Sequence, residues 1–368
     1  MKVAFDYQVF ATQRFGGISR YFFELAKNIP LVENSNCTVR VISPLYVCEY
    51  LKTGIQELPV LGMYMPQIPY TRKLVRGVNT ALSPKMLKNF SPHIIHETYY
   101  SVNQSRPLNA KRVVTVYDMI HELFPEQFDY HDKTSEAKKH AISRADHVVC
   151  ISNNTRSDLL RIHDVDPQKT SVVHLGFSLS GGNLKSSIGG RKPYLLYVGS
   201  RGGYKNFCRF IEAYGQSPML KLNFDVVAFG GGGFTMCEKS IFQELRISGS
   251  KITQVSGDDA LLESYYKDAA LFVFPSLYEG FGIPPLEAMS YGCPVACSNT
   301  SSIPEVVGDA AVLFDPNSTE SIMSSLEAVL LDSDFKEAMI KRGFDRIQRF
   351  SWRKCAEGTL GVYEQVLQ

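Results

Sequence analysis

The segment from Phe274 to Cys297 constrains the fold more than any other part of this sequence. Four apolar residues that end at Phe274 predict a short strand of the kind buried in a parallel sheet. Two glycines around one aromatic residue follow, and they allow a tight turn in which the backbone can approach a ligand closely. A helix then begins, because Pro284 and Pro285 suit a first helical turn, and a glycine and a proline lead into the next strand. The order is therefore strand, glycine loop, helix and strand.

This order of elements makes an anion site. At the carboxyl end of a parallel strand, the loop amides and the helix N-terminus present N–H donors and a partial positive charge. Glu279 lies in the loop and Glu287 about one turn inside the helix, so both can face a ligand docked at the helix mouth. A phosphate would repel them, whereas sugar hydroxyls can donate hydrogen bonds to them. Phosphate and sugar together predict a nucleotide sugar as the ligand.

The surrounding sequence carries a resemblance to a known family. Glu279 and Glu287, in E-G-F-G-I-P-P-L-E-A-M, resemble the E-x7-E motif of retaining GT-B glycosyltransferases, in particular glycosyltransferase family 4 (glycosyl transferases group 1, mannosyltransferase-like). The similarity is almost continuous from Leu261 to Pro316. It implies an α/β fold of GT-B type, with two doubly wound Rossmann-like domains facing a cleft and a C-terminal helix that crosses back to the first domain. Outside such a sequence context, a glutamate in the position of Glu287 is more often a solvated helix residue, and one in the position of Glu279 is more often an ordinary acidic residue of a loop.

The length of 368 residues also favours two domains, since one core rarely grows that large. We predict an acceptor-binding Rossmann-like domain over residues 1–175 and a linker over 176–192, where glycine and serine predominate. A nucleotide-sugar-binding Rossmann-like domain follows over 193–350. Residues 351–368 are predicted to form the C-terminal helix that packs toward the first domain.

The resemblance implies roles for the donor site. Glu287 would hold ribose hydroxyls and Glu279 the hexose, and backbone groups of the same loop would contact the donor. Arg201 and Lys205 would stabilise the departing diphosphate, although the spacing of Arg201 to Lys205 is shorter than the usual pattern; as plain surface cations they would be unremarkable. Backbone contacts with the donor are assigned to the following residues: Gly199, Gly230, Val255, Gly280, Phe281, Gly282 and Ile283.

Acceptor-side residues are expected in the first domain. Gly16 and Gly17 follow the first strand and look like the family's N-terminal glycine loop beside the donor phosphates and the acceptor; a tight turn alone is the other interpretation. Polar clusters follow two further strands, where side chains face the crevice of an open α/β sheet. We place Asp118 at the reaction centre or acceptor hydroxyl. His121 and His96 are weaker candidates, because the family's His-Asp pair is replaced here by Tyr117-Asp118, with a histidine displaced to His121.

Charge is unevenly shared between the two halves. The net charge is +2, and residues 1–175 carry 21 Lys and Arg against 16 Asp and Glu. The segment 71–112 is especially basic and has apolar residues interleaved with its first cations. It could lie on anionic lipid headgroups, or it could be a solvated helix face. The resemblance favours peripheral contact of this basic first domain with a membrane; no nucleic acid partner is expected.

The remaining composition indicates an ordinary globular protein. The eight cysteines show no zinc spacing and are expected to be reduced core residues, so neither a metal nor another cofactor is predicted. No apolar run is long enough to cross a membrane, and the N-terminal apolar residues stop at Asp6, too early for a secretory signal. We expect a cytoplasmic protein, with any membrane contact at the inner face.

The function implied by the resemblance is retaining transfer of a hexose from a nucleotide-diphospho sugar to a hydroxyl of a saccharide acceptor. GDP-mannose is the favoured donor, and a lipid-linked acceptor in surface polysaccharide or lipopolysaccharide biosynthesis is the family-level expectation. Alternatives are a UDP-sugar-dependent transferase, a GT-B nucleotide-sugar epimerase or hydrolase, and a noncatalytic binder. The G-x-G-x-x-G dinucleotide fingerprint is missing, which argues against an oxidoreductase.

Overall fold

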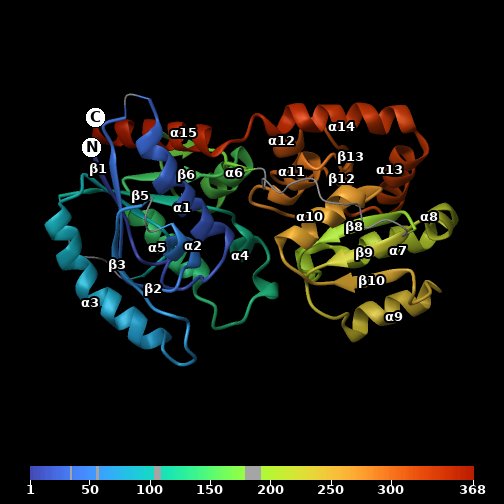
Figure 1. Cartoon of the computed structure of the whole chain (residues 1–368), viewed down its shortest axis with the longest axis horizontal. Helices are drawn as coiled ribbons and strands as arrows, with labels where there is room; N and C mark the ends of the chain where they lie inside the picture. Colours follow the sequence, from blue (N-terminus) through green and yellow to red (C-terminus); the bar gives the residue numbers. More distant parts are fainter. Residues whose placement is uncertain (34, 55–57, 103–108, 179–191) are drawn as a thin grey trace. The chain divides into compact units, whose positions relative to one another are not determined.

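The computed structural model describes residues 1–33, 35–54, 58–102, 109–178 and 192–368. The chain divides into two compact units (Figure 1). The first comprises Met1–Gly176 together with Phe350–Gln368, and the second comprises Phe177–Arg349. Most of the linker predicted over 176–192 lies outside the described residues. None of the helices in the described ranges has the length and apolar composition needed to span a membrane.

The first unit is built on a seven-stranded parallel sheet with strand order β3-β2-β1-β4-β5-β6-β7. Its strands are β1 (Lys2–Phe5), β2 (Thr38–Tyr46), β3 (Val60–Tyr64), β4 (Ile94–Glu97), β5 (Lys111–Val116), β6 (His147–Cys150) and β7 (Thr170–Val172). Its helices are α1 (Gly17–Asn28), α2 (Glu49–Thr53), α3 (Arg72–Phe90), α4 (Ile120–Leu123), α5 (Thr134–Arg144), α6 (Asn153–Ile162) and α15 (Trp352–Leu367).

The second unit is built on a six-stranded parallel sheet with strand order β10-β9-β8-β11-β12-β13. Its strands are β8 (Tyr194–Val198), β9 (Asp225–Phe229), β10 (Ile252–Val255), β11 (Leu271–Phe274), β12 (Val295–Ser298) and β13 (Val312–Phe314). Its helices are α7 (Phe207–Gln216), α8 (Pro218–Asn223), α9 (Met236–Glu244), α10 (Asp259–Asp268), α11 (Ile283–Ser290), α12 (Ile303–Val307), α13 (Thr319–Leu331) and α14 (Ser333–Ile347).

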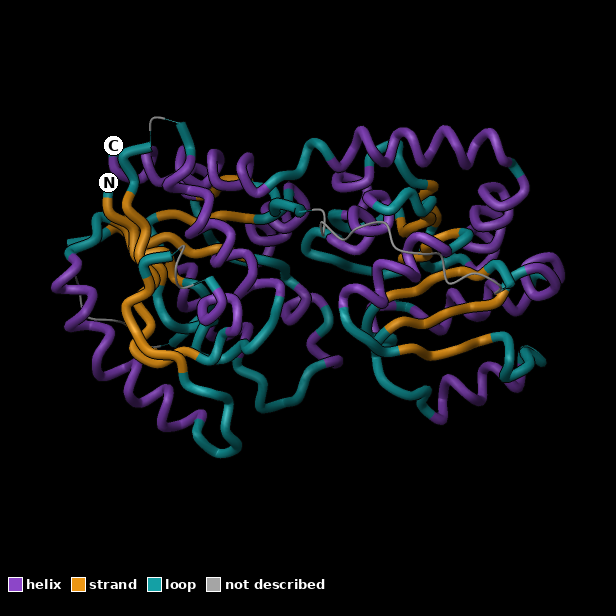
Figure 2. Tube along the Cα trace, viewed as in Figure 1, coloured by secondary structure: helices purple, strands orange, loops and turns teal. Residues whose placement is uncertain are grey.

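Each sheet has its first strand near the middle, and in each unit most consecutive strands are joined through a helix (Figure 2). β1 lies between β2 and β4, and β8 lies between β9 and β11. The strand order therefore reverses beside the first strand of each sheet. In doubly wound sheets, ligands bind outside the carboxyl ends of the strands at this reversal. The predicted pair of doubly wound Rossmann-like domains is confirmed.

Burial explains why short apolar runs become strands here. All four residues of β11 are buried, as are all four of β12, as expected for central strands covered by helices on both faces. The helices contribute one apolar face each. In α7, Phe207, Phe210, Ile211 and Tyr214 recur at helical spacing and are fully buried in the core of the second unit.

The first part of the basic segment 71–112 forms a long helix, α3. Its buried face includes Asn79, whose side chain accepts from the Leu45 amide at 3.1 Å and donates to the Leu45 carbonyl at 2.8 Å. Asn79 thereby holds β2 where its pairing with β3 shifts register, between Ile42 and Leu45. The strand runs to Tyr46, and Asn79 of α3 contacts it one residue before that end.

The C-terminal helix α15 belongs to the first unit, as predicted. The Tyr363 hydroxyl lies 2.6 Å from His96 Nδ1, and Thr115 Oγ1 lies 2.8 Å from Nε2 of the same ring. His96 is fully buried, and burial lowers the pKa of its imidazole to about 3. The imidazole is therefore neutral and ties β4 to α15. Its assignment as a residue facing the substrate crevice is wrong, because the side chain points into the core.

Replacing His96 with glutamine should change the pH dependence of stability. Between pH 6.5 and about 3 the unfolded chain binds a proton at this imidazole that the folded chain does not, so the free energy of unfolding decreases as pH falls. This contribution is about 1.4 kcal/mol per pH unit. Urea unfolding at pH 6.5, 5.5 and 4.5 should show that slope reduced by this amount in His96→Gln.

The control for this measurement is His140→Gln, an exposed position on α5. Asp6 has the opposite effect on the pH dependence of stability, because burial first, and the Glu97 charge second, raise the pKa of its carboxyl to about 6. As the pH falls, the folded chain therefore binds a proton at Asp6 before the unfolded chain does. The effect of His96 is isolated by comparing the slope of the variant with that of wild type. Equal slopes in His96→Gln and wild type would contradict the neutral buried imidazole.

Candidate active site

The loops that follow β8 and β11 are joined by direct contacts. Lys205 Nζ lies 2.7 Å from Glu279 Oε1 in an ion pair whose side chains are 22% and 12% exposed. Asn206 donates its side-chain amide to the carbonyls of Pro275 and Pro316, at 3.0 and 2.8 Å. Two residues predicted from the sequence, Lys205 and Glu279, are thus brought together at the reversal of strand order in the second unit.

The loop before α11 is anchored from behind by a serine pair. Ser302 is fully buried and donates from Oγ to the carbonyls of Glu279 and Phe281, at 2.8 and 2.9 Å. Ser301 Oγ accepts from the Glu279 amide at 3.0 Å. This pair was not among the site residues predicted from the sequence. Its signal was available, because Ser301 and Ser302 belong to the polar run directly after β12, at the same edge of the sheet.

Backbone geometry determines which amides can donate hydrogen bonds at the N-terminus of α11. Gly282 immediately precedes the helix and has φ +105°, a backbone conformation that residues other than glycine rarely adopt. Pro284 and Pro285 occupy the first turn and have no N–H to donate. The amides of Gly282 and Ile283 are therefore the groups that this helix end can offer to an anion. Phe281 is buried and fixes the loop beneath them.

Glu287 lies one turn inside α11 and is half-buried. Its Oε2 accepts a hydrogen bond from the Tyr266 hydroxyl at 3.1 Å. Burial first, and the Glu287 carboxylate second, raise the pKa of Tyr266 well above 10. The tyrosine therefore stays protonated and fixes the orientation of the carboxylate. This geometry suits a group that accepts hydrogen bonds from neutral hydroxyls.

Arg201 lies beneath the glycine loop that follows β9. Its guanidinium Nε donates to Glu238 at 2.6 Å, and its Nη atoms donate to the carbonyls of Gly230, Gly232 and Gly233, each at 2.9 Å. Burial raises the pKa of Glu238, but the hydrogen bonds from Arg201 and the Thr235 amide outweigh it, so the net shift is downward. Direct contact between Arg201 and the donor diphosphate stays a prediction.

The glycine loop itself packs tightly on the end of β8. A Cβ on Gly231 would lie 2.7 Å from Arg201 Nη1 and 2.9 Å from the Gly199 carbonyl, and the residue has φ +69°. Gly199 has φ +121°, and its amide donates to the Phe229 carbonyl at 2.9 Å. The Val255 carbonyl accepts from the Gly230 amide at 2.8 Å. The predicted backbone contacts at Gly199, Gly230 and Val255 therefore lie on neighbouring loops.

In the first unit, the predicted residues lie at the carboxyl ends of β1 and β5. Gly16 precedes α1 and Gly17 begins it. Asp118 accepts from the Ile120 amide at 3.0 Å, and Lys138 donates to its carbonyl at 2.8 Å. The Asp118 side chain is 29% exposed. Its Oδ1 also lies 3.8 Å from Lys138 Nζ, so only part of the carboxylate is open to a ligand.

His121 lies on α4 and is held on two sides. Its ring stacks on Phe128 with 3.9 Å between centroids, and Nε2 lies 3.6 Å from Asp132 Oδ2. Its Nδ1 is buried and has no hydrogen-bond partner among the residues that the structure describes. His121 follows Asp118 by three positions in the sequence. Its role in catalysis stays a prediction.

All eight cysteines are free, and six of them are buried. Within the described ranges, no group of three or more His, Cys, Asp or Glu side chains is arranged to hold a metal ion.

Comparison with known proteins agrees with this arrangement. Residues 15–180 match the family model described as Glycosyltransferase Family 4, and residues 184–346 match the model described as Glycosyl transferases group 1. The O-antigen chain mannosyltransferase B of Escherichia coli is 29% identical over 287 residues, which cover 72% of this chain and 74% of that protein. The O-antigen chain mannosyltransferase RfbU of Salmonella typhimurium is 25% identical over 282 residues, covering 74% and 76%.

A solved structure shares the fold over nearly the whole chain. Sucrose-phosphate synthase from Thermosynechococcus elongatus matches with a TM-score of 0.74 at 18% identity, covering 99% of this chain and 98% of that one. The two doubly wound units, with the final helix in the first, are those of a GT-B glycosyltransferase. Within that class, the chain belongs to glycosyltransferase family 4 (glycosyl transferases group 1).

Replacing Ser302 with alanine should loosen the loop that carries Glu279. The carbonyls of Glu279 and Phe281 lose their donor, which costs about 1–3 kcal/mol when no other donor replaces it. Thermal unfolding should show a lower midpoint, and hydrogen exchange should be faster at the amides of residues 279–283. Ser324→Ala, at an exposed position on α13, is the matched control. Unchanged exchange in Ser302→Ala would show that other contacts hold the loop.

Proposed function

We propose that the second unit binds a nucleotide-diphospho sugar at the β8 and β11 edge, and that the enzyme transfers its hexose to a hydroxyl of a saccharide acceptor. The observation that carries the proposal is the convergence of Lys205, Glu279 and the α11 mouth, with Glu287 one turn behind. A cation and amides suit the diphosphate, and oriented carboxylates suit sugar hydroxyls. The relatives named O-antigen chain mannosyltransferases support mannose as the hexose, with GDP-mannose as donor.

The Lys205–Glu279 pair has a direct role in this proposal. A diphosphate carries more negative charge than one carboxylate, so an arriving donor can replace Glu279 as the partner of Lys205. Glu279 then becomes available to the hexose hydroxyls. Lys205 neutralises the charge that grows on the leaving diphosphate, while Gly282 and Ile283 offer amides to the same group. Arg201 contributes through the glycine loop that it holds.

On the acceptor side, we assign to Asp118 the contact with the acceptor hydroxyl, and to His121 the support of Asp118. Gly16 and Gly17, at the N-terminus of α1, would face the donor phosphates and the acceptor. Transfer with retention, by front-face attack assisted by the leaving phosphate, is part of the proposal and follows the family resemblance. The anomeric configuration of the product, read by proton NMR before mutarotation, tests it. The cations and the helix end would serve in place of a metal ion.

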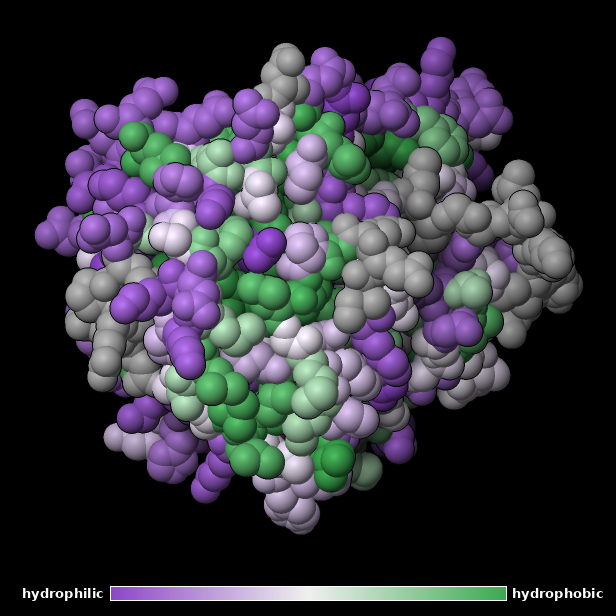
Figure 3. Space-filling view, turned by 60° about the vertical axis from the view of Figure 1, so that its left-hand side comes forward, coloured by the Kyte–Doolittle hydropathy of each residue, from purple (hydrophilic) through white to green (hydrophobic). Residues whose placement is uncertain are grey.

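Surface polysaccharide synthesis with a lipid-linked acceptor is also part of the proposal. It is supported by a basic and apolar surface on the first unit, around the start of α3. Figure 3 brings that side of the molecule forward and shows hydrophobic side chains bordered by hydrophilic ones. Ile68, Tyr70 and Leu74 are 51%, 101% and 59% exposed. Arg72 and Lys73 lie between them in sequence, a mixture that suits anionic headgroups at the inner face of a membrane.

Thermal-shift screening against GDP, UDP, dTDP and ADP sugars should identify the donor, because a ligand of the native state raises the melting temperature. We expect GDP-mannose to give the largest shift in wild type. Glu287→Ala should lower donor affinity about 10- to 100-fold, the value of charge-assisted hydrogen bonds of about 1.5–3 kcal/mol. The shift should then disappear at donor concentrations near the wild-type Kd.

The control is Glu337→Ala, an exposed position on α14. An unchanged shift in Glu287→Ala would remove this residue from the donor pocket. Mass spectrometry of donor incubated without acceptor distinguishes the alternatives, since an epimer or free sugar in stoichiometric yield would favour an epimerase or a hydrolase. A largest shift with a UDP sugar would favour the UDP-dependent transferase.

Membrane contact can be tested with vesicles of phosphatidylglycerol. The double variant Ile68→Ser and Leu74→Ser should bind them at least tenfold more weakly, because burying each such side chain contributes about 1.5–3 kcal/mol. Co-sedimentation gives the bound fraction. Leu222→Ser with Leu331→Ser, both 72% exposed in the second unit, is the matched control. Equal binding by the two double variants would contradict this docking surface.

A further inference from the structure

Two cysteines of the second unit lie in the first turns of neighbouring helices. Cys208 is the second residue of α7, and Cys237 is the second residue of α9. The two helices pack against each other. Cys237 is exposed and Cys208 is half-buried, whereas the other six cysteines are buried. These two thiols are therefore the ones that a dissolved oxidant can reach.

Aromatic rings bring the starts of the two helices together. Phe207 directly precedes Cys208 in the chain, and Phe234 lies just before α9. The rings of Phe207 and Phe234 are stacked, with 6.4 Å between their centroids and 16° between their planes. The Arg201 guanidinium carbon lies 5.7 Å from the first centroid and 4.8 Å from the second. One cation and two rings thus join the N-terminal turns of α7 and α9.

The charges around Cys208 indicate the same neighbourhood. Burial first, then the Glu238 carboxylate and then Cys237, raise the pKa of the Cys208 thiol, and Arg201 acts in the opposite direction. A half-buried thiol of this kind is a poor nucleophile as long as it is protonated. Cys237 is the more accessible of the two, so it is the thiol that reacts first with an oxidant, and Cys208 is its resolving partner.

The two thiols are separate from each other in the structure. Both cysteines are free, and within the described ranges no hydrogen bond joins them. A covalent S–S bond is much shorter than the contact between two free thiols. Forming the bond therefore requires the thiols to approach, which draws the first turn of α9 toward α7.

Glu238 connects this turn of α9 to the glycine loop that follows β9. It directly follows Cys237 in the chain and is buried. Its Oε1 accepts from Arg201 Nε at 2.6 Å, and its Oε2 accepts from the Thr235 amide at 2.6 Å. Arg201 in turn donates to carbonyls of the glycine loop. A displacement of Cys237 therefore acts on that loop through one charge-assisted hydrogen bond.

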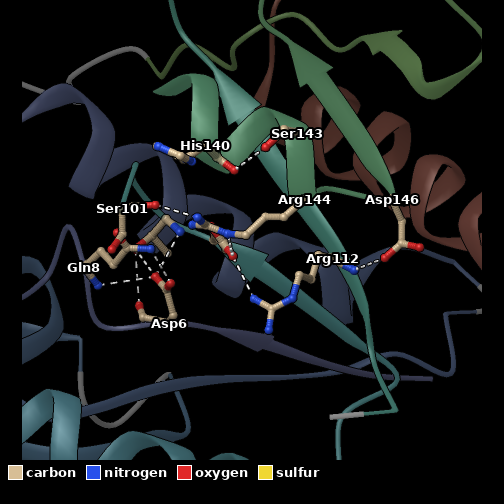
Figure 4. A network of polar contacts seen from close by, with 10 residues as sticks. Asp6, Gln8, Ser101, Arg112, His140, Ser143, Arg144 and Asp146 are labelled. Atoms are coloured by element: carbon tan, nitrogen blue, oxygen red, sulfur yellow. Dashed lines mark hydrogen bonds and ion pairs between the residues drawn. The ribbon is translucent and has the colours of Figure 1, made fainter. Parts of the chain in front are cut away.

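A buried carboxylate of the first unit has two such partners rather than one. Arg112 and Arg144, which Figure 4 shows, both pair with Glu97. In the part of the chain that the structure describes, Arg201 is the only cation paired with Glu238. Glu97 keeps one guanidinium when the other contact is disturbed, whereas Glu238 loses its counter-charge. The glycine loop is therefore sensitive to a displacement of its single support.

We propose that Cys208 and Cys237 form a reversible disulfide, and that this bond loosens the glycine loop that follows β9. Hydrogen peroxide is the oxidant. The Cys237 thiolate attacks one peroxide oxygen, which leaves a sulfenic acid and releases water, and the Cys208 thiolate then displaces a second water from that sulfur. Two electrons pass from the two sulfur atoms to the O–O bond that breaks, and both thiol protons leave in the water.

In a reducing compartment such a bond is transient, as redox-sensing disulfides are. The inference rests on the proposed function only for its consequence, which is weaker binding of a nucleotide beside the loop. Formation of the bond and loosening of the loop do not depend on it.

Peptide mapping of the full chain tests the bond. After treatment with hydrogen peroxide and blocking of the remaining thiols, tryptic digestion without reduction should give peptide 206–209 linked to peptide 222–239, each with one cysteine. Dithiothreitol should remove the link, and Cys208→Ser and Cys237→Ser should each prevent it. Absence of the linked peptides in wild type, or chains joined to one another through Cys237, would overturn the proposal.

Hydrogen exchange tests the effect on the loop. The reporter is the Gly230 amide, which donates to the Val255 carbonyl at 2.8 Å. It should exchange about tenfold faster or more in oxidised than in reduced wild type, the usual effect of losing a charge-assisted hydrogen bond. Cys237→Ser is the control, because it keeps Met236, which is 77% exposed and can form a sulfoxide. Unchanged exchange in wild type, or equal acceleration in the control, would contradict the proposal.

Calorimetric titration with GDP connects the loop to donor binding. Oxidation should weaken GDP binding by wild type about tenfold or more, and dithiothreitol should restore it. Cys208→Ser should bind GDP equally well before and after peroxide, and its reduced form should melt at the temperature of reduced wild type. Equal affinity of linked and reduced wild type would refute the effect on the donor site. If GDP does not bind reduced wild type, the proposed donor is wrong, while mapping and exchange still decide whether the disulfide acts on the loop.

Discussion

The reversal of strand order beside the first strand of each sheet is the constraint on which the rest of the structure depends. In the second unit, β8 and β11 are neighbours whose connections lead to opposite sides of the sheet, so their loops separate above a shared edge. Lys205 comes from one loop and Glu279 from the other. In the first unit, β1 and β4 supply Tyr7 and Tyr99 in the same way. The same topological rule thus brings side chains from two loops together at one edge of each sheet.

The two ion pairs of the second unit differ in burial, and this difference separates their roles. Arg201 and Glu238 are 4% and 6% exposed, so breaking their pair would leave an uncompensated charge in a dry environment. Lys205 and Glu279 are more exposed, and water or a ligand can replace either partner. The first pair is therefore a fixed support for the glycine loop. The second is accessible enough for water or a ligand to replace one partner.

Much of this could be predicted from the sequence where the information is local. The apolar run at 271–274, the glycines at 280 and 282 and the prolines at 284 and 285 determine a strand, a turn and a helix within one short segment. Contacts between distant residues could not be read in this way. Arg201 turns toward Glu238, 37 positions later, and His96 faces Tyr363. A polar residue near the end of a strand looks the same in sequence whether it faces a crevice or the core.

The placement of α15 has a consequence for the order in which the protein matures. The first unit combines residues 1–176 with residues 350–368, so its core is incomplete until α15 has been synthesised. Tyr363 is the partner that His96 lacks until then. The second unit is encoded without interruption and can fold while the chain is still on the ribosome. The core of the first unit is therefore completed after that of the second.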